Sequence, residues 1–239
     1  NGLTLNGTAH LSGYSSRLDF AGTQSFGASS GQTATVEMGE YNTKLQVTDG
    51  GTLTLESTVT VVGEGTVTGS GTGDAIINNG LIHANQDNAN IILSPETFTN
   101  TGTLRASNNG GLSLKNDWDN NGTIELDSGR LYLYGDNETA DLNQPSFVRV
   151  GASAVYLAGS LDNTGDTLSQ VGTIDFIGGS VVGGTSNVDF NATSNMSEFA
   201  DGVTLNADLN LAGSNSHFEI QNGLTLNGTA HLSGYSSRL

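Results

Sequence analysis

The chain begins and ends with the same string, NGLTLNGTAHLSGYSSRL, at positions 1–18 and 222–239. The copies start at Asn1 and Asn222, so every residue of the first copy has a counterpart in the second. So long an unbroken identity does not arise by chance. We therefore expect 1–221 to be one unit of a long repeat, and 222–239 the start of the next, with near-identical copies continuing on both sides. We call this string the repeated segment.

A shorter period runs inside the long one. Residues 202–220 align without a gap on 223–239 and, through the long repeat, on 19–20, with Gly202 matching Gly223 and Ile220 matching Phe20. The middle of the chain repeats the same pattern, with Ile82, Leu104 and Ile124 in equivalent positions. Because the steps between equivalent residues differ slightly in length, we place the differences in turns, where solenoids accept insertions.

Each short unit contains three alternating apolar and polar stretches separated by Gly, Asn and Ser, which predicts three short strands with one face inward. In the last full unit the expected strands are 203–205, 209–211 and 218–220. Strands this short, in units this short, do not fit a β-sandwich. We predict an all-β fold, a parallel β-solenoid continuous over 1–239, with coils of about 20–22 residues stacked about 4.8 Å apart.

Asn-Gly pairs precede several expected strands. They begin at Asn1, Asn79, Asn121 and Asn222. Since Asn and Gly adopt positive φ more readily than other residues, we expect them to form corners with that geometry.

The composition excludes several classes of function. The chain has 24 acidic and 7 basic residues, a net charge of −17, which disfavours binding to nucleic acid or anionic lipid. It has no cysteine, so disulfides and Cys-ligated zinc are excluded. No apolar run approaches the roughly 20 residues of a membrane helix, so we expect no membrane insertion. The four histidines show no metal-ligand spacing, and we predict no cofactor.

Two groups of outward residues are the candidate contact sites. If Leu131, Leu133, Val155 and Leu157 point inward, alternation turns their neighbours outward, as a surface for sugars or another fibre. These neighbours are Tyr132, Tyr134 and Tyr156.

The steps that align the apolar positions of the middle units also align His83, Arg105 and Glu125 on the outside. We therefore expect Arg105 and Glu125 to form an ion pair between neighbouring coils, with His83 on the other side of Arg105.

Two alternative chemistries remain open. Asp117 and Asp119, with Glu125 and Asp127 nearby, are the best local group of carboxylates for glycoside hydrolysis. Alternation around Trp118 favours solvated acids instead. The segment 69–76 partly matches a calcium-binding repeat but lacks its tandem repetition, so we interpret it as a turn. Weak calcium binding by the acidic surface stays a hypothesis.

The run FTNTGTLRASNNGGLSLKNDWDNNGTIELDSGRLYL, residues 98–133, resembles the repeats of filamentous-haemagglutinin-like adhesins, autotransporter passengers and giant bacterial surface proteins. The resemblance lies in the Asn-x-Gly-Thr-hydrophobic pattern and covers most of the chain. It implies a right-handed β-helix, secretion and a cell-surface location. It transfers no active-site residue, because these families share a scaffold.

Together these features predict a non-enzymatic structural unit of an extracellular fibre, stalk or adhesin shaft on a bacterial cell surface. Its expected partners are adjacent copies of the repeat end to end, and laterally other fibres or cell-surface polysaccharide. The alternative is a β-helix that binds or degrades polysaccharide.

Overall fold

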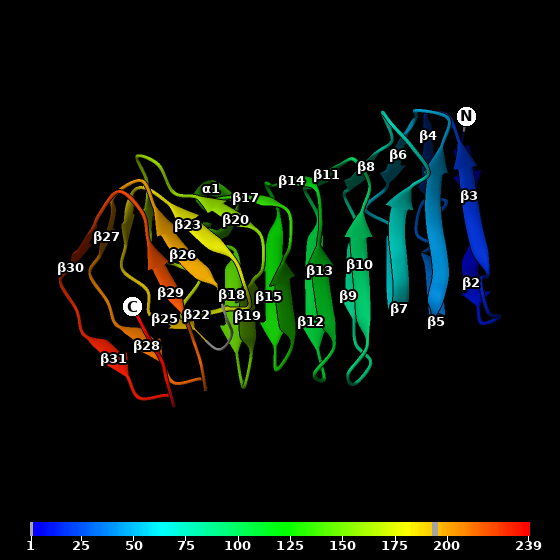
Figure 1. Ribbon diagram of the computed structural model, residues 1–239. Coiled ribbons are helices and arrows are strands. Elements are labelled where there is room, and N and C mark those ends of the chain that lie inside the picture. The colour runs from blue at the N-terminus through cyan, green and yellow to red at the C-terminus, as the bar shows by residue number, and fades with distance from the viewer. Residues whose placement is uncertain (1, 193–195) are drawn as a thin grey trace. The chain divides into compact units, whose positions relative to one another are not determined.

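The computed structural model describes residues 2–192 and 196–239. Asn1 lies outside the described residues. The chain forms two compact units, the first containing residues 1–131 and 150–153, the second 132–149 and 154–239. It is nearly all β, and its parallel sheets stack as a β-solenoid of about ten turns (Figure 1). The predicted fold class is confirmed.

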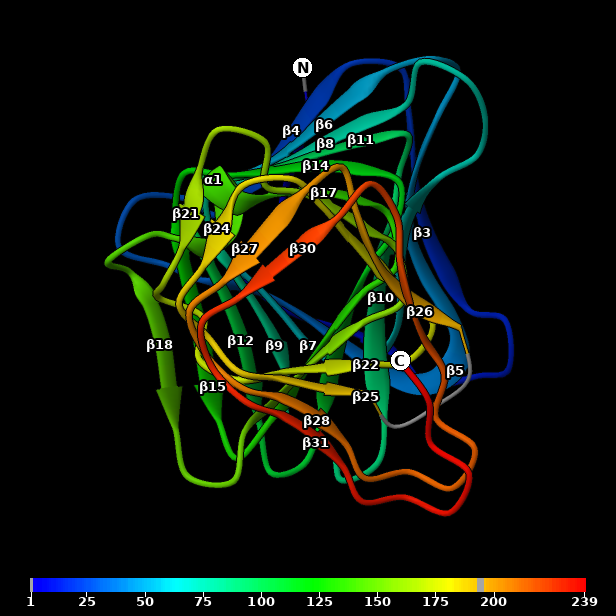
Figure 2. The same cartoon turned by 60° about the vertical axis from the view of Figure 1, so that its left-hand side comes forward.

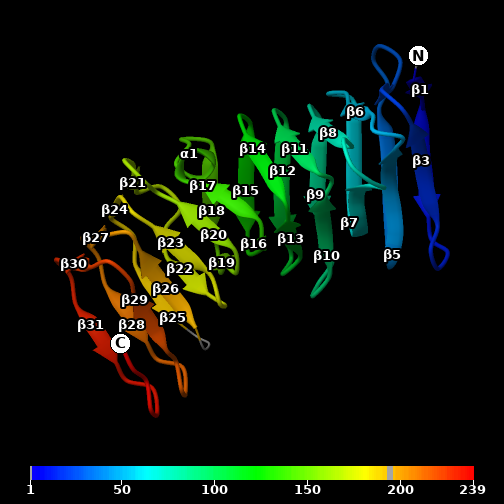
Figure 3. The same ribbon diagram turned by 45° about the horizontal axis from the view of Figure 1, so that its top comes forward.

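Each coil of the first unit contributes to three columns of strands, and Figure 3 shows the strands of successive coils side by side. The first column contains β1 (Gly2–Thr4), β4 (Gln24–Gly27), β6 (Thr52–Leu55), β8 (Ala75–Asn78), β11 (Thr97–Asn100) and β14 (Asp117–Asn120). The second contains β2 (Gly7–Leu11), the first parts of β5 (Ala34–Thr48) and β7 (Val59–Gly69), β9 (Leu81–Ala84), β12 (Thr103–Ser107) and β15 (Thr123–Asp127). The third contains β3 (Arg17–Ala21), the second parts of β5 and β7, β10 (Asn90–Ser94) and β13 (Gly111–Leu114). The chain passes between the units within β16 (Arg130–Leu133), within β18 (Phe147–Val150) and again after Ser153.

The second unit also has three columns, one of them a separate sheet that Figure 2 shows as parallel arrows. The first contains β17 (Asp136–Glu138), β20 (Ser160–Asp162), β23 (Ser180–Val182), β26 (Ser197–Ala200) and β29 (Phe218–Ile220). The separate sheet contains β21 (Thr167–Leu168), β24 (Thr185–Ser186), β27 (Val203–Leu205) and β30 (Leu224–Leu226). The third contains β19 (Ala154–Leu157), β22 (Ile174–Phe176), β25 (Phe190–Ala192), β28 (Leu209–Leu211) and β31 (Ala230–Leu232). A single turn of helix, α1 (Thr139–Leu142), follows β17.

The three strands predicted for the last full unit are β27, β28 and β29, with the same bounds. Strand length and coil length are less regular than predicted. β5 has 15 residues and β7 has 11, because two faces of one coil join through a bend, with a register shift between Gly39 and Lys44. The length of a coil varies from the short step between the register partners Ile174 and Phe190 to the long step between Gln24 and Leu53.

Aliphatic columns fill the core of the first unit. Ile82, Leu104 and Ile124 are register partners in successive coils and have no exposed surface. Because a coil has one narrow apolar face per strand, it buries this face only by stacking on its neighbours.

A column of buried asparagines runs beside the aliphatic core. Asn78, Asn100 and Asn120 occupy the last positions of β8, β11 and β14 and are at most 2% exposed. The Asn78 amide donates to Asn100 Oδ1 at 2.8 Å, and the Asn100 amide donates to Asn120 Oδ1 at 2.7 Å. Each amide thus meets its hydrogen-bonding demand through the next coil, as a buried polar group must.

The core of the second unit contains a cluster of aromatic rings. Phe176 lies at 5.2 Å from Phe190 and from Phe218, measured between ring centroids, and Phe199 lies at 4.6 Å from Phe218. Most of these pairs meet edge to face, an arrangement that aromatic rings prefer.

Ile220 lies on the inward face of β29, as the alternation predicts, because it is the register partner of the fully buried Phe199. It is 36% exposed, because no described coil stacks on that edge of β29. One local expectation was wrong. Asn79 and Asn121 do not adopt positive φ, although Asn222 does, with φ of 59°. Glycine after Asn79 serves a different purpose, since a Cβ on Gly80 would lie 2.3 Å from the Val59 carbonyl oxygen.

Candidate functional site

The three predicted tyrosines form a cluster on the outer surface of the second unit. The Tyr132 and Tyr156 rings stack with centroids 4.9 Å apart and planes inclined by 15°. Tyr134 stacks on Tyr132 at 6.2 Å and is 44% exposed. Because Tyr132 and Tyr156 turn ring faces toward each other, a ligand would meet mainly their edges, together with Tyr134.

A polar column that the sequence analysis did not identify extends from this cluster. Tyr156, Asp175, Asn191, Asn210 and His231 are successive register partners. The Asn191 amide donates to Asp175 Oδ1 at 2.7 Å, and the Asn210 amide donates to Asn191 Oδ1 at 3.1 Å. The length of the step changes along this column, so an alignment at a fixed period does not reveal it.

The predicted column on the outside of the first unit is present in the structure. Arg105 is the register partner of both His83 and Glu125. Its Nε lies 3.7 Å from Glu125 Oε2, and its Nη2 lies 3.7 Å from Asp127 Oδ2. Burial and the Arg105 cation hold the pKa of His83 below its ordinary value, although Glu125 acts in the opposite direction.

Asp127 is a second partner of Arg105 that the sequence analysis missed. It lies two positions after Glu125 and therefore on the same face of β15, within diagonal reach of a long side chain. The guanidinium thus bridges two carboxylates of the next coil.

We expect Arg105→Gln to destabilise the chain more than Glu125→Gln, because Asp127 still holds the cation after Glu125 is lost. A double-mutant cycle on Arg105 and Glu125, measured by urea denaturation, should give a coupling of about 0.2–1 kcal/mol that decreases with added salt. A coupling unchanged at high salt would contradict an exposed ion pair.

Asp74 holds the turn between β7 and β8, the segment that partly matches a calcium-binding repeat. Its side chain is fully buried. The backbone N–H groups of Gly51, Ser70 and Gly71 donate to its carboxylate at 3.1, 2.7 and 2.9 Å. Burial acts to raise the pKa of Asp74, but these donors and the Ser70 hydroxyl outweigh burial and lower it. The carboxylate therefore caps a turn, as interpreted from the sequence.

We expect Asp74→Asn to cost about 1.5–3 kcal/mol near neutral pH, because an amide group replaces an oxygen that accepts backbone hydrogen bonds. Because folding lowers the pKa of Asp74, its contribution is present above the ordinary value of 3.8 and is lost as pH falls through the folded value. The gap between the wild type and the variant in thermal denaturation should therefore narrow in acid. The exposed Asp117→Asn is the matched control and should have little effect.

The candidate carboxylates for hydrolysis lie on two different sheets. Trp118 is 3% exposed and is the register partner of Phe98, so Asp117 and Asp119 point outward from β14. Glu125 and Asp127 lie on β15 and face Arg105. This arrangement agrees with the interpretation of Asp117 and Asp119 as solvated acids.

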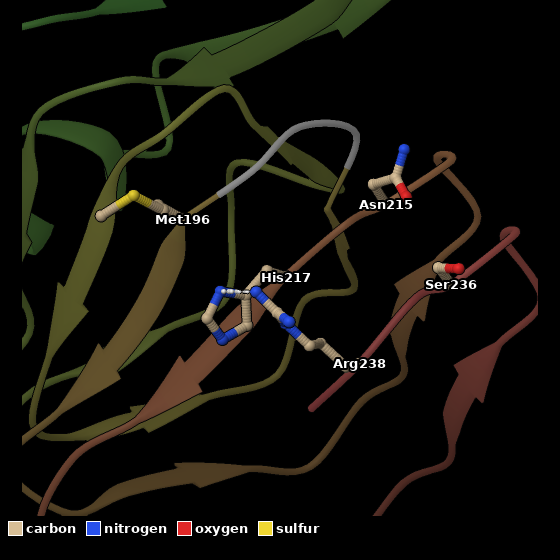
Figure 4. Close-up of a pocket in the computed structure, with 5 residues that line it drawn as sticks. All are labelled: Met196, Asn215, His217, Ser236 and Arg238. Carbon is tan, nitrogen blue, oxygen red and sulfur yellow. Dashed lines mark hydrogen bonds between the residues drawn. The ribbon is translucent and has the colours of Figure 1, made fainter.

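A depression of about 540 Å³ lies in the second unit (Figure 4). Its lining residues are Met196, Asn215, His217, Ser236 and Arg238. Arg238 points toward the His217 ring and lies 3.3 Å from Nδ1. In the first copy of the repeated segment the equivalent residue, Arg17, pairs with Asp19 at 2.9 Å.

Comparisons with protein-family models, curated proteins and solved structures find no match. Among residues 2–192 and 196–239, no group of three or more His, Asp or Glu side chains is arranged to hold a metal ion. Within the same ranges, no helix is long and apolar enough to cross a membrane.

Proposed function

We propose that the chain is a structural unit of a long extracellular fibre, stalk or adhesin shaft on a bacterial cell surface, in which copies of the repeat, 1–221, follow one another end to end. Continuous strand ladders would resist extension, repetition would set the length, and the net charge of −17 would keep neighbouring fibres apart or let cations bridge them. The extracellular location rests on the resemblance of the repeat pattern.

The observation that carries this proposal is that the two copies of the repeated segment use opposite edges. In the first copy, β1 pairs with β4, and β2 pairs with β5, so the later coil covers it. In the second copy, β30 pairs with β27, and β31 pairs with β28, so the earlier coil covers it. One sequence therefore accepts a neighbour on either side.

The backbone hydrogen bonds of the two edges do not compete. In the first copy the Leu5 N–H donates to the Gly27 carbonyl oxygen at 2.9 Å. In the second copy the N–H of Asn227, equivalent to Asn6, donates to the Leu205 carbonyl oxygen at 2.8 Å. Because neighbouring residues of a strand direct their N–H groups to opposite sides, one segment has donors for both coils at once.

Two glycines of the repeated segment are each required by contact with only one of the two neighbouring coils. A Cβ on Gly228 would lie 2.0 Å from the Ala207 carbonyl oxygen, whereas the equivalent Gly7 has open space around its Cβ position. Conversely, a Cβ on Gly2 would lie 2.1 Å from the Ser25 carbonyl oxygen, whereas Gly223 has open space. Both glycines are required for steric reasons only where the segment is covered on both sides.

Burial of the apolar positions follows the same rule. Leu11 is 9% exposed in the first copy, where β5 covers it, and the equivalent Leu232 is 46% exposed in the second. A following copy of residues 24–48 would cover the exposed leucine as it does in the first copy. Burying exposed strand edges also removes sites of unspecific pairing.

A two-repeat chain, residues 1–221 followed directly by 1–239, tests the proposal. The chain has no native cysteine, so two introduced cysteines can form an intramolecular disulfide only with each other. In both variants, cysteine replaces the asparagine at the junction, which is Asn6 of the second repeat and corresponds to Asn227. In the first variant, the other cysteine replaces Asn206 of the first repeat. In the second variant, it replaces Ser29 of the second repeat.

We expect a disulfide in both variants, because adjacent coils about 4.8 Å apart suit disulfide geometry. Exposed pairs in unrelated coils, such as Asn206 with Asn88, are the control. Failure of either junction pair to form would contradict end-to-end stacking. Images of material with many repeats should show fibres with an axial repeat of about 50 Å.

A second candidate function is polysaccharide binding, which the tyrosine cluster and its polar column favour. A row of half-buried aromatic and amide groups, with Tyr134 exposed at one end, suits a linear sugar chain. Replacing Tyr134 and Tyr156 by Ala should abolish retention on immobilised cell-surface polysaccharide while leaving the disulfides of the two-repeat chain intact. Turnover of the polysaccharide, rather than retention, would instead favour the degrading enzyme.

A further inference from the structure

The histidine of the repeated segment meets a different carboxylate in each copy, through a different ring nitrogen. In the first copy, His10 Nδ1 lies 2.7 Å from Glu37 Oε2, in the coil that follows. In the second copy, the equivalent His231 has its Nε2 3.6 Å from Asp208 Oδ2, in the coil that precedes. The two contacts use different nitrogens of the imidazole ring, so one side chain has an atom for each.

The neighbouring asparagine shows the same division. Asn6 donates through Nδ2 to Ser29 Oγ at 3.1 Å and accepts the Ser29 N–H at 2.8 Å. The equivalent Asn227 donates through Nδ2 to Asn206 Oδ1 at 2.8 Å. An amide has two N–H donors, so all three bonds fit on one side chain. The side chains of the repeated segment are thus suited to two neighbouring coils at once.

We propose that, where one copy of the repeat follows another, this histidine binds Asp208 of the earlier copy and Glu37 of the later copy together, forming a charged bridge across three successive coils. The partner is a second copy of this chain, so the inference rests on the proposed end-to-end arrangement. In this arrangement, the contact of the histidine with both carboxylates at the repeat boundary depends on protonation of the ring.

The chemistry of the ring sets the protonation state. A neutral imidazole has one N–H, whereas two carboxylate acceptors require a donor at each nitrogen, which only the imidazolium supplies. The bridge would therefore have one positive charge between two negative ones.

The groups around the histidine are acidic or uncharged in the part of the chain that the structure describes. Around His10, Glu37 is the one charged residue among the other side chains that line a depression of about 340 Å³. On the preceding side, the Asp208 N–H donates to Asp189 Oδ1 at 2.9 Å, which places a further acid one coil away. The neighbours of His10 on β2 are Thr8, Ala9 and Leu11, which carry no charge.

Because both contacts together need an imidazolium, the bridge should stabilise the boundary more at mildly acidic pH than at mildly alkaline pH. The two-repeat chain contains three such histidines, of which only the internal one has both acids. Replacing the internal histidine by Gln is therefore the test. Replacing either outer histidine by Gln is the matched control.

Urea denaturation at about pH 5.5 and about pH 8 measures the effect. At the lower pH we expect the internal substitution to raise the unfolding equilibrium constant by about two- to twentyfold, and each outer one by about twofold, since exposed ion pairs are individually weak. At the higher pH the excess of the internal substitution should vanish. Changing Glu37 of the second repeat to Gln should remove part of the pH dependence.

Equal effects at internal and outer positions, or an internal effect that is independent of pH, would overturn the bridge. The disulfide variants separate this outcome from failure of the proposed function. If the junction disulfides form and the histidine substitutions show no excess, the repeats stack without the bridge. If the disulfides do not form, the end-to-end arrangement itself is wrong.

Discussion

Leu104→Asp should destabilise the first unit by several kcal/mol, the largest effect that we expect from one substitution. Leu104 has no exposed surface and lies between Ile82 and Ile124 in neighbouring coils. A carboxylate there would be buried among aliphatic side chains without a partner, which is among the most costly changes in a protein core.

Thr103→Asp is the matched control, because it introduces the same carboxylate one position earlier on the outer face of β12. Thr103 is half-buried, and its register partners are Leu81 and Thr123. Urea denaturation of both variants should show a far smaller loss for Thr103→Asp. Similar losses would mean that inward and outward positions have been exchanged.

Asn100→Ala should cost about 1–3 kcal/mol, because it removes the middle amide of the buried asparagine column and the shortest hydrogen bonds of both neighbouring asparagines. The Asn78 amide loses its acceptor at 2.8 Å and keeps only the longer contacts with the Gly80 and Thr103 carbonyl oxygens at 3.3 and 3.4 Å. Asn120 Oδ1 loses its donor at 2.7 Å and keeps the Gly122 N–H at 3.3 Å. Thermal denaturation measures the loss, with Asn90→Ala on the outer face of β10 as control.

Replacing Asn78, Asn100 and Asn120 together by Leu offers a sharper comparison. Because no side-chain amide is then left unpaired, the triple variant should lose less stability than three times the single loss, although the Gly80 and Gly122 N–H groups lose their asparagine acceptors. A triple variant that loses the full sum would show that the column stabilises the core by more than mutual satisfaction of its amides.

The coil register of the middle units could be predicted because alternation and period agree there. Leu104 is buried beside its register partner Ile124, and Trp118 beside its register partner Phe98. The predicted period fails between β2 and β7, where two faces of a coil merge into one long strand and the coil grows longer. In β5 the buried positions alternate up to Met38, stop over 39–42 and resume in the opposite phase from Thr43. A sequence pattern broken in this way is typical of two strands separated by a turn, so it does not reveal one long strand.

The asparagine column could also have been predicted from the sequence. Asn78, Asn100 and Asn120 recur in the same steps as Ile82, Leu104 and Ile124. Asparagine was interpreted only as a corner residue, because its turn preference is strong. A polar residue that recurs in step with the coils can instead be buried and satisfied by its own copies.

That column also bears on how the chain finds its register during folding. Its first member, Asn78, has Leu55 as register partner in the earlier coil, so the column has a defined beginning. A coil that slipped by one turn would place a buried amide against an aliphatic side chain, without a partner. Apolar columns alone would tolerate such a slip, since Ile, Leu and Val substitute for one another. The asparagines thus specify the coil register in a fold whose coils otherwise resemble each other. They destabilise folding intermediates in which the coils are out of register.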